Sequence, residues 1–432
     1  RTGRAPQRLI LTKRPTRADL ELILDVADGA GMTIARLPRL TELRSGEDQR
    51  IELRPVAIED LLGRTQTKLD RAAMLRLIEG RRVLVTGAGG SIGAELVRQV
   101  AGFRPAHLAL LDNSEYQLYE IGLELDETHG ALSRSMMLAD VRDRARLDQI
   151  MAAEAPDLVF HAAALKHVPM LEANALEGVL TNVIGTRNTA EACRKAGVAA
   201  MVLISTDKAI NPSSVMGATK RLAESYCQAL DIAERRRGQS GTRFVTVRFG
   251  NVLGSTGSVV PLFHRQLAAG GPLTVTHPDM RRYFMTVREA VELVLQASAL
   301  GVEGPAEEAG KIYVLEMGEP VKIMDLARHM IRLSGLRPDK DVKIVVTGPR
   351  PGEKLHEELF HEAEPLLPAR HPGLRLASPR TVNQELLGRS LDELAALAAK
   401  GRSAEALAMI RRLVPEYHPS ETAAADSAAV AS

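Results

Sequence analysis

Short apolar runs alternate with longer helical segments from Arg82 onwards. The apolar runs read VLVT, HLALLD, LVFHAAA, MVLIS and FVTVRF, and helical segments of ten or more residues separate them. Uninterrupted apolar runs of this kind are typical of strands that are buried on both faces of a parallel sheet. The pattern therefore predicts an α/β fold, with a doubly wound parallel sheet over residues 81–250.

The pattern is less regular on both sides of this region. Residues 18–30 read as an amphipathic helix followed by the strand-like TIARLP, so residues 1–50 are expected to be the end of an α/β unit. Residues 51–80 are expected to be a connector that ends in a helix. After Asn251, strand and helix signals mix through PLTV, KIYVLEMG and VKIVVTG, which predicts a smaller mixed subdomain with returning elements over residues 251–415. The low-complexity end of the chain predicts a disordered tail over residues 416–432.

Composition narrows the classes of function. The 432 residues carry 56 basic and 54 acidic side chains with 3% aromatic residues and no Trp, so no dedicated nucleic-acid surface is expected. Cys193 and Cys227 give neither a disulfide framework nor a metal-binding pattern, and they favour a reducing cytosol. No apolar run approaches the roughly 18 residues of a membrane span, so no membrane contact is expected from this chain. The chain begins at Arg1 without an initiator Met, which leaves membrane helices in a preceding part as an open alternative.

A glycine-rich loop follows the first strand of the predicted sheet. VLVT runs into TGAGGSIG and then into the helix AELVRQVA. Gly87, Gly90 and Gly93 fit a TGxxGxxG spacing, whereas Ile92 occupies the last glycine position of the stricter GxGxxG. Glycines at these positions permit a tight turn and let backbone amides approach a pyrophosphate at the helix N-terminus. The loop therefore predicts a dinucleotide site.

The ends of the next strands supply further cofactor contacts. Asp112 closes HLALLD 19 residues after the last of these glycines, where a carboxylate accepts hydrogen bonds from an adenosine ribose and repels a 2′-phosphate, so NAD is favoured over NADP. Asp140 and Val141 close the following strand and are expected beside adenine, and the small residues after His161 let the cofactor approach. No carboxylate or cysteine accompanies His161 and His167 at ligand spacing, so no metal site is predicted.

The segment STDK, residues 205–208, raises a question about catalysis. Dehydrogenases with such a glycine loop usually carry YxxxK, but the position four residues before Lys220 holds Met216. A thioether neither donates nor accepts a catalytic proton, so either the chain is not an enzyme or its proton transfer runs through other groups. Asp207 and Lys208 share one site only if the chain bends at the strand end, and AINP with Pro212 favours such a bend.

Seven motifs together resemble one known family. TGAGGSIGAEL, LLDNSEYQLYEI, HAAALKHVPMLE, NVIGTRN, STDKAINPSSVMGATKR, VRFGNVLGSTGSV and PRPGEKLHEEL occur in this order. They are similar to the Rossmann-like polysaccharide-biosynthesis branch of the extended short-chain dehydrogenases/reductases, and more narrowly to its long, membrane-associated UDP-N-acetylglucosamine 4,6-dehydratases. The resemblance covers roughly residues 52–365. It implies that residues 1–50 end a preceding nucleotide-fold-like domain, and that Met216 marks a subtype, because long members also carry Met there.

The resemblance implies NAD-dependent 4,6-dehydration of a UDP-N-acetylhexosamine to a 4-keto-6-deoxy sugar nucleotide for bacterial surface polysaccharide, with UDP-N-acetylglucosamine as the expected substrate. It assigns Asp207 as the acid that protonates the departing C6 hydroxyl and Lys208 as the base at C5. Thr206 is placed near the C4 hydroxyl and, because a threonine is a poor base, is expected to relay the proton through water or the cofactor ribose. Lys220 orients the nicotinamide ribose, and Met216 packs beside the nicotinamide and the sugar.

The residues and the resemblance together give two sets of predicted ligand contacts. The predicted cofactor-binding residues are Gly87, Gly90, Ser91, Ile92, Gly93, Asp112, Asn113, Ser114, Asp140, Val141, His161, Ala162, Ala163, Lys166, Asn182, Ser205 and Lys220. The predicted substrate-binding residues are Lys166, His167, Asn211, Arg248, Asn251, Arg281, Arg282, Arg350 and Glu353. Arginine forks suit a nucleotide diphosphate. Family analogy alone implies a homo-oligomer, and a full-length protein at the inner membrane with this part on the cytoplasmic side.

Two alternative functions stay open. A UDP-sugar 4-epimerase would use the same cofactor cycle, but the expected YxxxK is missing and Asp207 and Lys208 would have no role. A non-catalytic dinucleotide-binding sensor would explain the loss of the tyrosine, but it gives no reason to keep Asp207, Lys208 and Lys220 together. The sequence also leaves open whether C5 is retained or inverted, and whether the substrate has the gluco or the galacto configuration.

Overall fold

The computed structural model describes residues 8–13, 15, 17–30, 32–37, 54–55, 67–237, 241–361, 364 and 366–419. The predicted doubly wound sheet is confirmed, because nine strands form one sheet in the order β17-β18-β14-β9-β8-β7-β4-β5-β6. The strands from β14 to β6 in this order are parallel. At the other edge, β18 pairs antiparallel with β14, and β17 pairs antiparallel with β18. The nine strands are β4 (Arg82–Thr86), β5 (His107–Asp112), β6 (Arg134–Leu138), β7 (Leu158–His161), β8 (Ala200–Thr206), β9 (Arg243–Phe249), β14 (Ile312–Leu315), β17 (Leu366–Pro368) and β18 (Leu374–Ala377).

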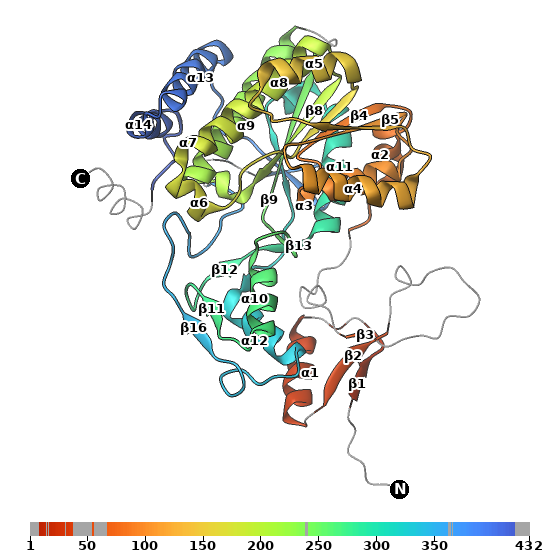
Figure 1. Ribbon diagram of the computed structural model, residues 1–432, viewed down its shortest axis with the longest axis vertical. Coiled ribbons are helices and arrows are strands. Elements are labelled where there is room, and N and C mark those ends of the chain that lie inside the picture. Colours follow the sequence, from red (N-terminus) through yellow and green to blue (C-terminus); the bar gives the residue numbers. More distant parts are fainter. Residues whose placement is uncertain are drawn as a thin grey trace.

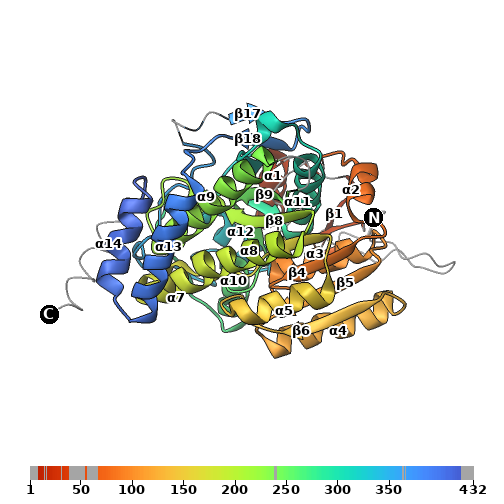
Figure 2. The same ribbon diagram turned by 90° about the horizontal axis from the view of Figure 1, so that it is seen from above.

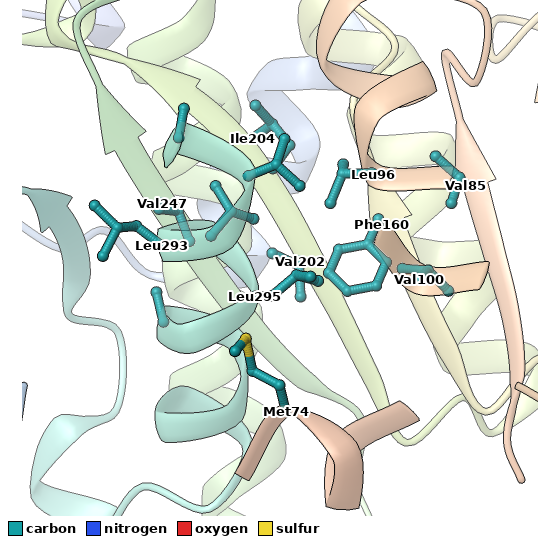
Figure 3. Close-up of a cluster of buried hydrophobic side chains, with 14 of the residues drawn as sticks. Met74, Val85, Leu96, Val100, Phe160, Val202, Ile204, Val247, Leu293 and Leu295 are labelled. Atoms are coloured by element: carbon teal, nitrogen blue, oxygen red, sulfur yellow. The ribbon is translucent and has the colours of Figure 1, made fainter. Parts of the chain in front are cut away.

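The central strands are buried on both faces, because their residues alternate between two hydrophobic clusters. Val83 and Val85 of β4 pack in one cluster, and Leu84 packs in the other. Phe160 of β7 and Val202 of β8 belong to the first cluster, where they meet side chains from helices α3 and α11 (Figure 3). Burial of both faces explains why the strands read as uninterrupted apolar runs in the sequence.

Helices cover both faces of the sheet (Figures 1 and 2). On one face lie α2 (Arg71–Ile78), α3 (Ser91–Ala101), α4 (Glu115–His129) and α11 (Val287–Val302). On the other face lie α5 (Arg144–Glu154), α8 (Thr186–Ala196) and α9 (Val215–Arg236). Shorter helical segments are α6 (Val168–Ala173), α7 (Ala175–Gly178), the π-helical η3 (Val179–Gly185), and the tight turns η4 (Asp207–Ala209) and η5 (Ala306–Glu308).

The strand order changes direction at β4. The chain continues from β4 to β5 and β6 on one side, and then crosses back to β7 on the other side. Strand β4 pairs with β5 on one side and with β7 on the other, so the carboxyl ends of β4 and β7 border the same crevice. In open α/β sheets, ligands bind at such a topological switch point. The fold therefore brings the glycine loop after β4 and the residues after β7 to one site.

A smaller lobe follows β9 and lies beyond one end of the large sheet (Figure 1). Its strands form two-stranded pairs: β10 (Asn251–Leu253) with β13 (Phe284–Thr286), β11 (Leu273–Val275) with β16 (Ile344–Val346), and β12 (Arg281–Arg282) with β15 (Val321–Lys322). Helices α10 (Val259–Ala268) and α12 (Ile323–Leu333) enclose a separate hydrophobic core, which includes Phe263, Leu273 and Leu326. The strands predicted in PLTV and VKIVVTG are β11 and β16. Their signals were mixed in the sequence because these strands are short.

Two C-terminal helices return to the large sheet and pack beside α9 (Figure 2). Leu391 of α13 (Gln384–Ala399) and Ile410 of α14 (Ser403–Leu413) join the hydrophobic cluster that α9 also lines. Tyr417 is buried in the same cluster, and the His418 amide donates a 3.0 Å hydrogen bond to the Pro212 carbonyl. Residues 416–418 therefore do not belong to a disordered tail, and residues 420–432 of the predicted tail lie outside the described residues.

A small α/β unit forms the N-terminal end. The strands β1 (Arg8–Leu11) and β2 (Thr33–Arg36) are parallel and connected by α1 (Arg17–Gly29), and β3 (Arg54–Pro55) adds an antiparallel strand. The helix and the strand predicted here are confirmed. Leu20 of α1 packs with Leu333 of α12, so the unit lies against the smaller lobe (Figure 1). Its membership of a preceding domain stays a prediction, since residues 1–7, 38–53 and 56–66 lie outside the described residues. Within the described ranges, no helix is both long and apolar enough to cross a bilayer.

Candidate active site

In the loop between β4 and α3, the backbone packs directly against other backbone segments. Gly87 has a φ of +66°, and a Cβ atom there would lie 2.6 Å from the Ala163 nitrogen. A Cβ atom at Gly93 would lie 1.8 Å from the Gly87 carbonyl oxygen, so both positions require glycine, in agreement with the TGxxGxxG spacing. Gly90 begins α3 without a side-chain cap, which leaves the first amides of this helix to face a phosphate.

Asp112 ends β5 beside this loop and is 6% exposed. Its Oδ2 accepts a 2.8 Å hydrogen bond from the Gly89 amide, and its Oδ1 accepts a 2.9 Å hydrogen bond from the Ser114 amide. The carboxylate lines a cavity together with Asp140 and Val141. A carboxylate fixed in this place suits a ribose with a free 2′-hydroxyl and repels a 2′-phosphate, so the glycine loop and Asp112 fit NAD.

A larger cavity of about 490 Å³ extends from the glycine loop along the carboxyl ends of β8 and β9. Together the two cavities are lined by most of the residues predicted for the cofactor. These are Gly87, Gly90, Ser91, Ile92, Gly93, Asp112, Asn113, Asp140, Val141, Ala162, Ala163, Lys166, Ser205 and Lys220. Gln117 of α4 lines both cavities too, and it was not predicted because nothing distinguishes it from other polar residues of that helix.

Three residues predicted to contact the cofactor do not line these cavities. The ring nitrogens of His161 bond to the hydroxyls of Thr86 (2.7 Å) and Thr186 (3.0 Å), and burial, with the charge of Lys220, lowers the pKa of His161 to about 3. His161 is therefore a neutral, fully bonded residue beneath the site. Ser114 caps the N-terminus of α4 instead of facing the cavity.

Asn182 of the π-helical segment also acts from below the cavities. It is fully buried, accepts a 2.8 Å hydrogen bond from the Leu165 amide, and donates bonds to the Leu165 carbonyl (3.0 Å) and the Thr219 hydroxyl (3.1 Å). Its side chain therefore fixes the loop that carries Leu165 and Lys166, and the prediction of a direct cofactor contact is wrong.

The predicted bend at the end of β8 is confirmed. The strand stops at Thr206, and Asp207 to Ala209 form a single tight turn. Lys208 Nζ donates 3.0 Å hydrogen bonds to Asp207 Oδ1 and to Asn251 Oδ1, and the Thr206 hydroxyl donates a 2.9 Å bond to Asp207 Oδ1. The acid and the base predicted from STDK thus form one hydrogen-bonded pair.

Glu357 completes this cluster, although the sequence did not predict it. Its Oε1 lies 3.3 Å from Lys208 Nζ, and its side chain is 4% exposed. Burial, with the charge of Glu357, raises the pKa of Asp207 above its ordinary value, against the effect of Lys208. Burial alone would lower the pKa of Lys208, but the carboxylates of Asp207 and Glu357 raise it above its ordinary value. Lys208 is therefore an ammonium between two carboxylates.

Met216 and Lys220 lie in the first two turns of α9 and both line the larger cavity. Met216 is 3% exposed. Lys220 Nζ donates a 2.7 Å hydrogen bond to the Ile204 carbonyl, and burial lowers the pKa of Lys220 to about 8, against the charge of Glu224. The lysine of the usual YxxxK is thus present beside the cavity, and a methionine lies where the tyrosine would be.

A third cavity, of about 200 Å³, lies between the large domain and the smaller lobe. It shares Lys166, His167, Lys208 and Asn251 with the larger cavity, so the two meet at Lys208. Its lining is rich in cations. The ionisable residues of the lining are Lys166, His167, Lys208, Arg282, Arg350, Glu353, Lys354 and Glu357. Lys354 was not predicted, since the PRPGEKLHEEL segment offers several charges and no means to rank them.

Three residues predicted for the substrate lie elsewhere. Arg248 is 0% exposed within β9, where its guanidinium donates two hydrogen bonds to Glu224 (2.8 and 2.7 Å) and one to Glu364 (2.9 Å). It is a core ion pair and not a ligand contact. Arg281 is exposed at the surface of β12, and the Asn211 amide donates to Glu358 at 3.2 Å. Neither lines the cavities described above.

The described residues contain no group of three or more His, Cys, Asp or Glu side chains placed to hold a metal ion. Cys193 and Cys227 are both buried as free thiols, and burial raises the pKa of each above its ordinary value.

This fold, the glycine loop with Asp112 and the lysine of α9 define an extended short-chain dehydrogenase/reductase. Residues 83–378 match the model of the polysaccharide biosynthesis protein family, and the chain belongs to this family.

Two relatives in this family illustrate the similarity. The chain is 48% identical over 335 residues to the capsular polysaccharide biosynthesis protein CapD of Staphylococcus aureus, covering 77% of this chain and 54% of CapD. It is 33% identical over 283 residues to the UDP-N-acetylglucosamine 4,6-dehydratase (inverting) of Campylobacter jejuni, covering 65% of this chain and 78% of that enzyme. The chain thus spans little more than half the length of CapD.

Solved structures show the same architecture. The X-ray structure of Pen from Bacillus thuringiensis has a TM-score of 0.61 and 33% identity, and covers 71% of this chain and 89% of Pen. A double mutant of the dTDP-glucose 4,6-dehydratase DesIV from Streptomyces venezuelae, with NAD bound, has a TM-score of 0.53 and 23% identity, and covers 64% of this chain and 82% of DesIV. The second likeness supports the fold alone.

Proposed function

We propose that the chain catalyses the NAD-dependent 4,6-dehydration of UDP-N-acetylglucosamine to a 4-keto-6-deoxy sugar nucleotide for surface polysaccharide synthesis. One observation carries the proposal: Lys208, whose side chain is 21% exposed, and the buried Asp207 form an acid–base pair, 3.0 Å apart, where the larger cavity meets the cation-lined one. Elimination of water needs a base at one carbon of the substrate and an acid at the neighbouring leaving group. A simple oxidation or reduction does not need such an adjacent pair. The similarity to the Campylobacter enzyme supports the same reaction.

The chain's own residues would bind and orient the cofactor. The amides at the start of α3 would hold the pyrophosphate, and Asp112 would hold the adenosine ribose. Lys220 would bond to the nicotinamide ribose, exchanging its present bond to the Ile204 carbonyl. When bound, NAD accepts a hydride from C4 and returns it to C6. The proton transfers at C5 and at the leaving oxygen are therefore left to residues of the chain.

Asp207 and Lys208 would carry out the elimination after C4 is oxidised. Transfer of the shared proton along their 3.0 Å hydrogen bond converts the ion pair into a neutral amine and a carboxylic acid. The amine of Lys208 takes the C5 proton, which the neighbouring ketone makes acidic. As the C5–C6 double bond forms, the C6–O bond breaks, and the carboxyl of Asp207 protonates the leaving oxygen to give water. The pair ends this step with one proton again, on Lys208. A proton must then add to C5 as the hydride returns to C6, and this proton balances the one released from the C4 hydroxyl.

Proton removal from the C4 hydroxyl is assigned to Thr206 and a relay beyond it. Thr206 lines the larger cavity, and its hydroxyl is oriented by its bond to Asp207. A threonine hydroxyl is a weak base, so it would pass the proton through water or the cofactor ribose towards Lys220. Met216 contributes packing and no proton chemistry.

The cation-lined cavity would bind the diphosphate of the substrate. Arg282 and Arg350 present guanidinium groups, and Lys166 and Lys354 add ammonium groups on the same lining. Arg282 is 5% exposed, and bonds to the carbonyls of Lys354 (2.8 Å) and Leu355 (3.2 Å) hold it in place. A fixed guanidinium is better suited to a diphosphate than a mobile one.

A mass measurement tests the proposal. The purified chain, loaded with NAD, is incubated with UDP-N-acetylglucosamine, and the sugar nucleotide is weighed by mass spectrometry. The proposal expects a product lighter by one water. An isomer of unchanged mass would indicate a 4-epimerase, and recovery of the substrate alone would indicate a non-catalytic binding protein.

Two further parts of the proposal rest on family analogy alone. The protein would form a homo-oligomer, and this chain would belong to a longer protein held at the inner membrane.

A further inference from the structure

Glu357 reaches the catalytic turn from a loop of the smaller lobe. Its Oε1 lies 3.3 Å from Lys208 Nζ and 3.7 Å from Arg282 Nε, and its side chain is 4% exposed. Within the described residues, Glu357 Oε2 and Asp207 Oδ2 are both buried without a hydrogen-bond partner. Two buried carboxylates therefore flank one ammonium, and each keeps one unbonded oxygen in the cluster. An unbonded buried carboxylate oxygen is costly, which indicates a role beyond packing.

Charged groups from several elements face this cluster. Asp207 and Lys208 come from the turn after β8, and Arg282 comes from β12. Burial alone would raise the pKa of Glu357, but the positive charges of Lys208, Arg282 and Lys354 hold it below its ordinary value. Glu357 therefore stays a carboxylate while it faces the Asp207–Lys208 pair. The remaining ionisable groups around the cluster are Lys166, His167, Tyr283, Arg350 and Glu353.

We propose that Glu357 is a positioning residue that anchors Lys208 and sets the pH window in which the Asp207–Lys208 pair carries its single reactive proton. The inference rests on the proposed dehydration, because that reaction needs the pair in its singly protonated state. A fixed negative charge beside the pair makes both of its titrations occur at higher pH: a second proton is gained more readily, and the single proton is lost less readily. Glu357 and Asn251 also hold the ammonium of Lys208, because Glu357 Oε1 lies 3.3 Å and Asn251 Oδ1 lies 3.0 Å from its Nζ.

The first test is the pH dependence of kcat at saturating substrate in the Glu357→Gln variant. Loss of the charge is expected to move both limbs of the profile to lower pH, by about one unit each, as expected for one nearby charge. The KM for the UDP-sugar is expected not to rise, because the substitution removes a negative charge from the diphosphate cavity. Glu357→Asp keeps the charge on a shorter side chain, so both limbs are expected at their wild-type positions with a lower kcat.

Glu358→Gln provides the matched control for this test. Glu358 is the adjacent glutamate, its side chain is 44% exposed, and it pairs with Lys354 at 2.6 Å. Its profile is expected to coincide with that of the wild type. The proposal is overturned if the two limbs of the Glu357→Gln pH profile stay in place or move in opposite directions. The amount of NAD released on denaturation shows that each variant is folded.

A second measurement needs neither turnover nor a folded variant of Glu357. Carbon-13 NMR of the wild-type protein, labelled at aspartate side-chain carboxyls and assigned with Asp207→Asn, follows the titration of Asp207 directly. The proposal expects Asp207 to titrate above the ordinary aspartate range, and a midpoint within or below that range overturns it. If the wild type releases no dehydrated product, the proposed function fails, and this titration still decides whether Asp207 has the protonation state assigned to it.

Discussion

Lys220 Nζ donates a 2.7 Å hydrogen bond to the carbonyl of Ile204, two residues before Thr206 on the same strand. This bond ties the start of α9 to the carboxyl end of β8, so the lysine and the STDK turn have a fixed relative position. Lys220 is 5% exposed, and burial lowers its pKa to about 8. A buried cation is therefore kept where the cofactor and the sugar would meet.

The first prediction concerns the cost of burying Lys220. A lysine whose pKa falls on folding destabilises the folded state at low pH, and this cost disappears as pH rises from about 8 towards 10.5. The free energy of unfolding of the wild type is therefore expected to rise relative to that of Lys220→Met over this range, by on the order of 2 kcal/mol. Denaturant unfolding at a series of pH values measures the difference. Lys195→Met, at a lysine whose side chain is 68% exposed, serves as the control, and parallel curves for wild type and Lys220→Met would contradict the prediction.

The second prediction separates Met216 from its neighbours in catalysis. Met216→Leu is expected to keep most of the activity, because only packing is assigned to the thioether. Thr206→Val and Lys220→Met are each expected to lose about 3 to 5 kcal/mol of transition-state stabilisation, which is ~10²- to 10⁴-fold in kcat. Steady-state rates at saturating substrate make the comparison. If Met216→Leu is as damaged as Thr206→Val, the methionine has a role beyond packing.

The third prediction separates oxidation from elimination. Asp207→Asn and Lys208→Met remove the acid and the base of the elimination, but they leave the hydride transfer from C4 in place. Both variants are expected to show the absorbance of reduced nicotinamide on mixing with UDP-N-acetylglucosamine, and to release no dehydrated product. Stopped-flow absorbance and mass spectrometry give the two readouts. Normal turnover in either variant would remove that residue from the mechanism.

The fourth prediction tests the reassignment of Arg248. Its guanidinium and the carboxylate of Glu224 are both 0% exposed and share two hydrogen bonds, so Arg248→Met leaves a buried charge without its main partner. The expected loss is about 3 to 5 kcal/mol in the free energy of unfolding. Arg281→Met, at the exposed surface of β12, is expected to change it by less than about 0.5 kcal/mol. A stable Arg248→Met protein with a raised KM for the UDP-sugar would restore the diphosphate role predicted from the sequence.

The large sheet could be predicted because its strands are buried on both faces. The alternation of Val83, Leu84 and Val85 between two clusters requires an apolar residue at every position, and such runs are visible in the sequence. The strands of the smaller lobe are two or three residues long, so their periodicity is too short to define their pairing. The pairing of β11 with β16 joins segments far apart in the chain, and no local pattern specifies it.

The candidate site could be predicted where one motif supplies all of its parts. The glycine loop and the STDK turn are each a contiguous motif. Spacing indicated Gly87 and Gly93, and the family resemblance indicated the Asp207–Lys208 pair. Arg248 was assigned wrongly because an arginine near a strand end reads as exposed, and its partner Glu224 belongs to a different helix. Glu357 was missed because its proximity to Lys208 depends on the docking of the smaller lobe.

The most direct test of the central claim follows one deuterium atom. UDP-N-acetylglucosamine deuterated at C4 is incubated with the NAD-loaded chain, and the product is examined by mass spectrometry and NMR. Intramolecular 4,6-dehydration predicts a product that has lost one water and carries the deuterium at C6, because the hydride taken from C4 is returned to C6. A product of unchanged mass with the deuterium still at C4 would contradict the dehydration and indicate epimerisation.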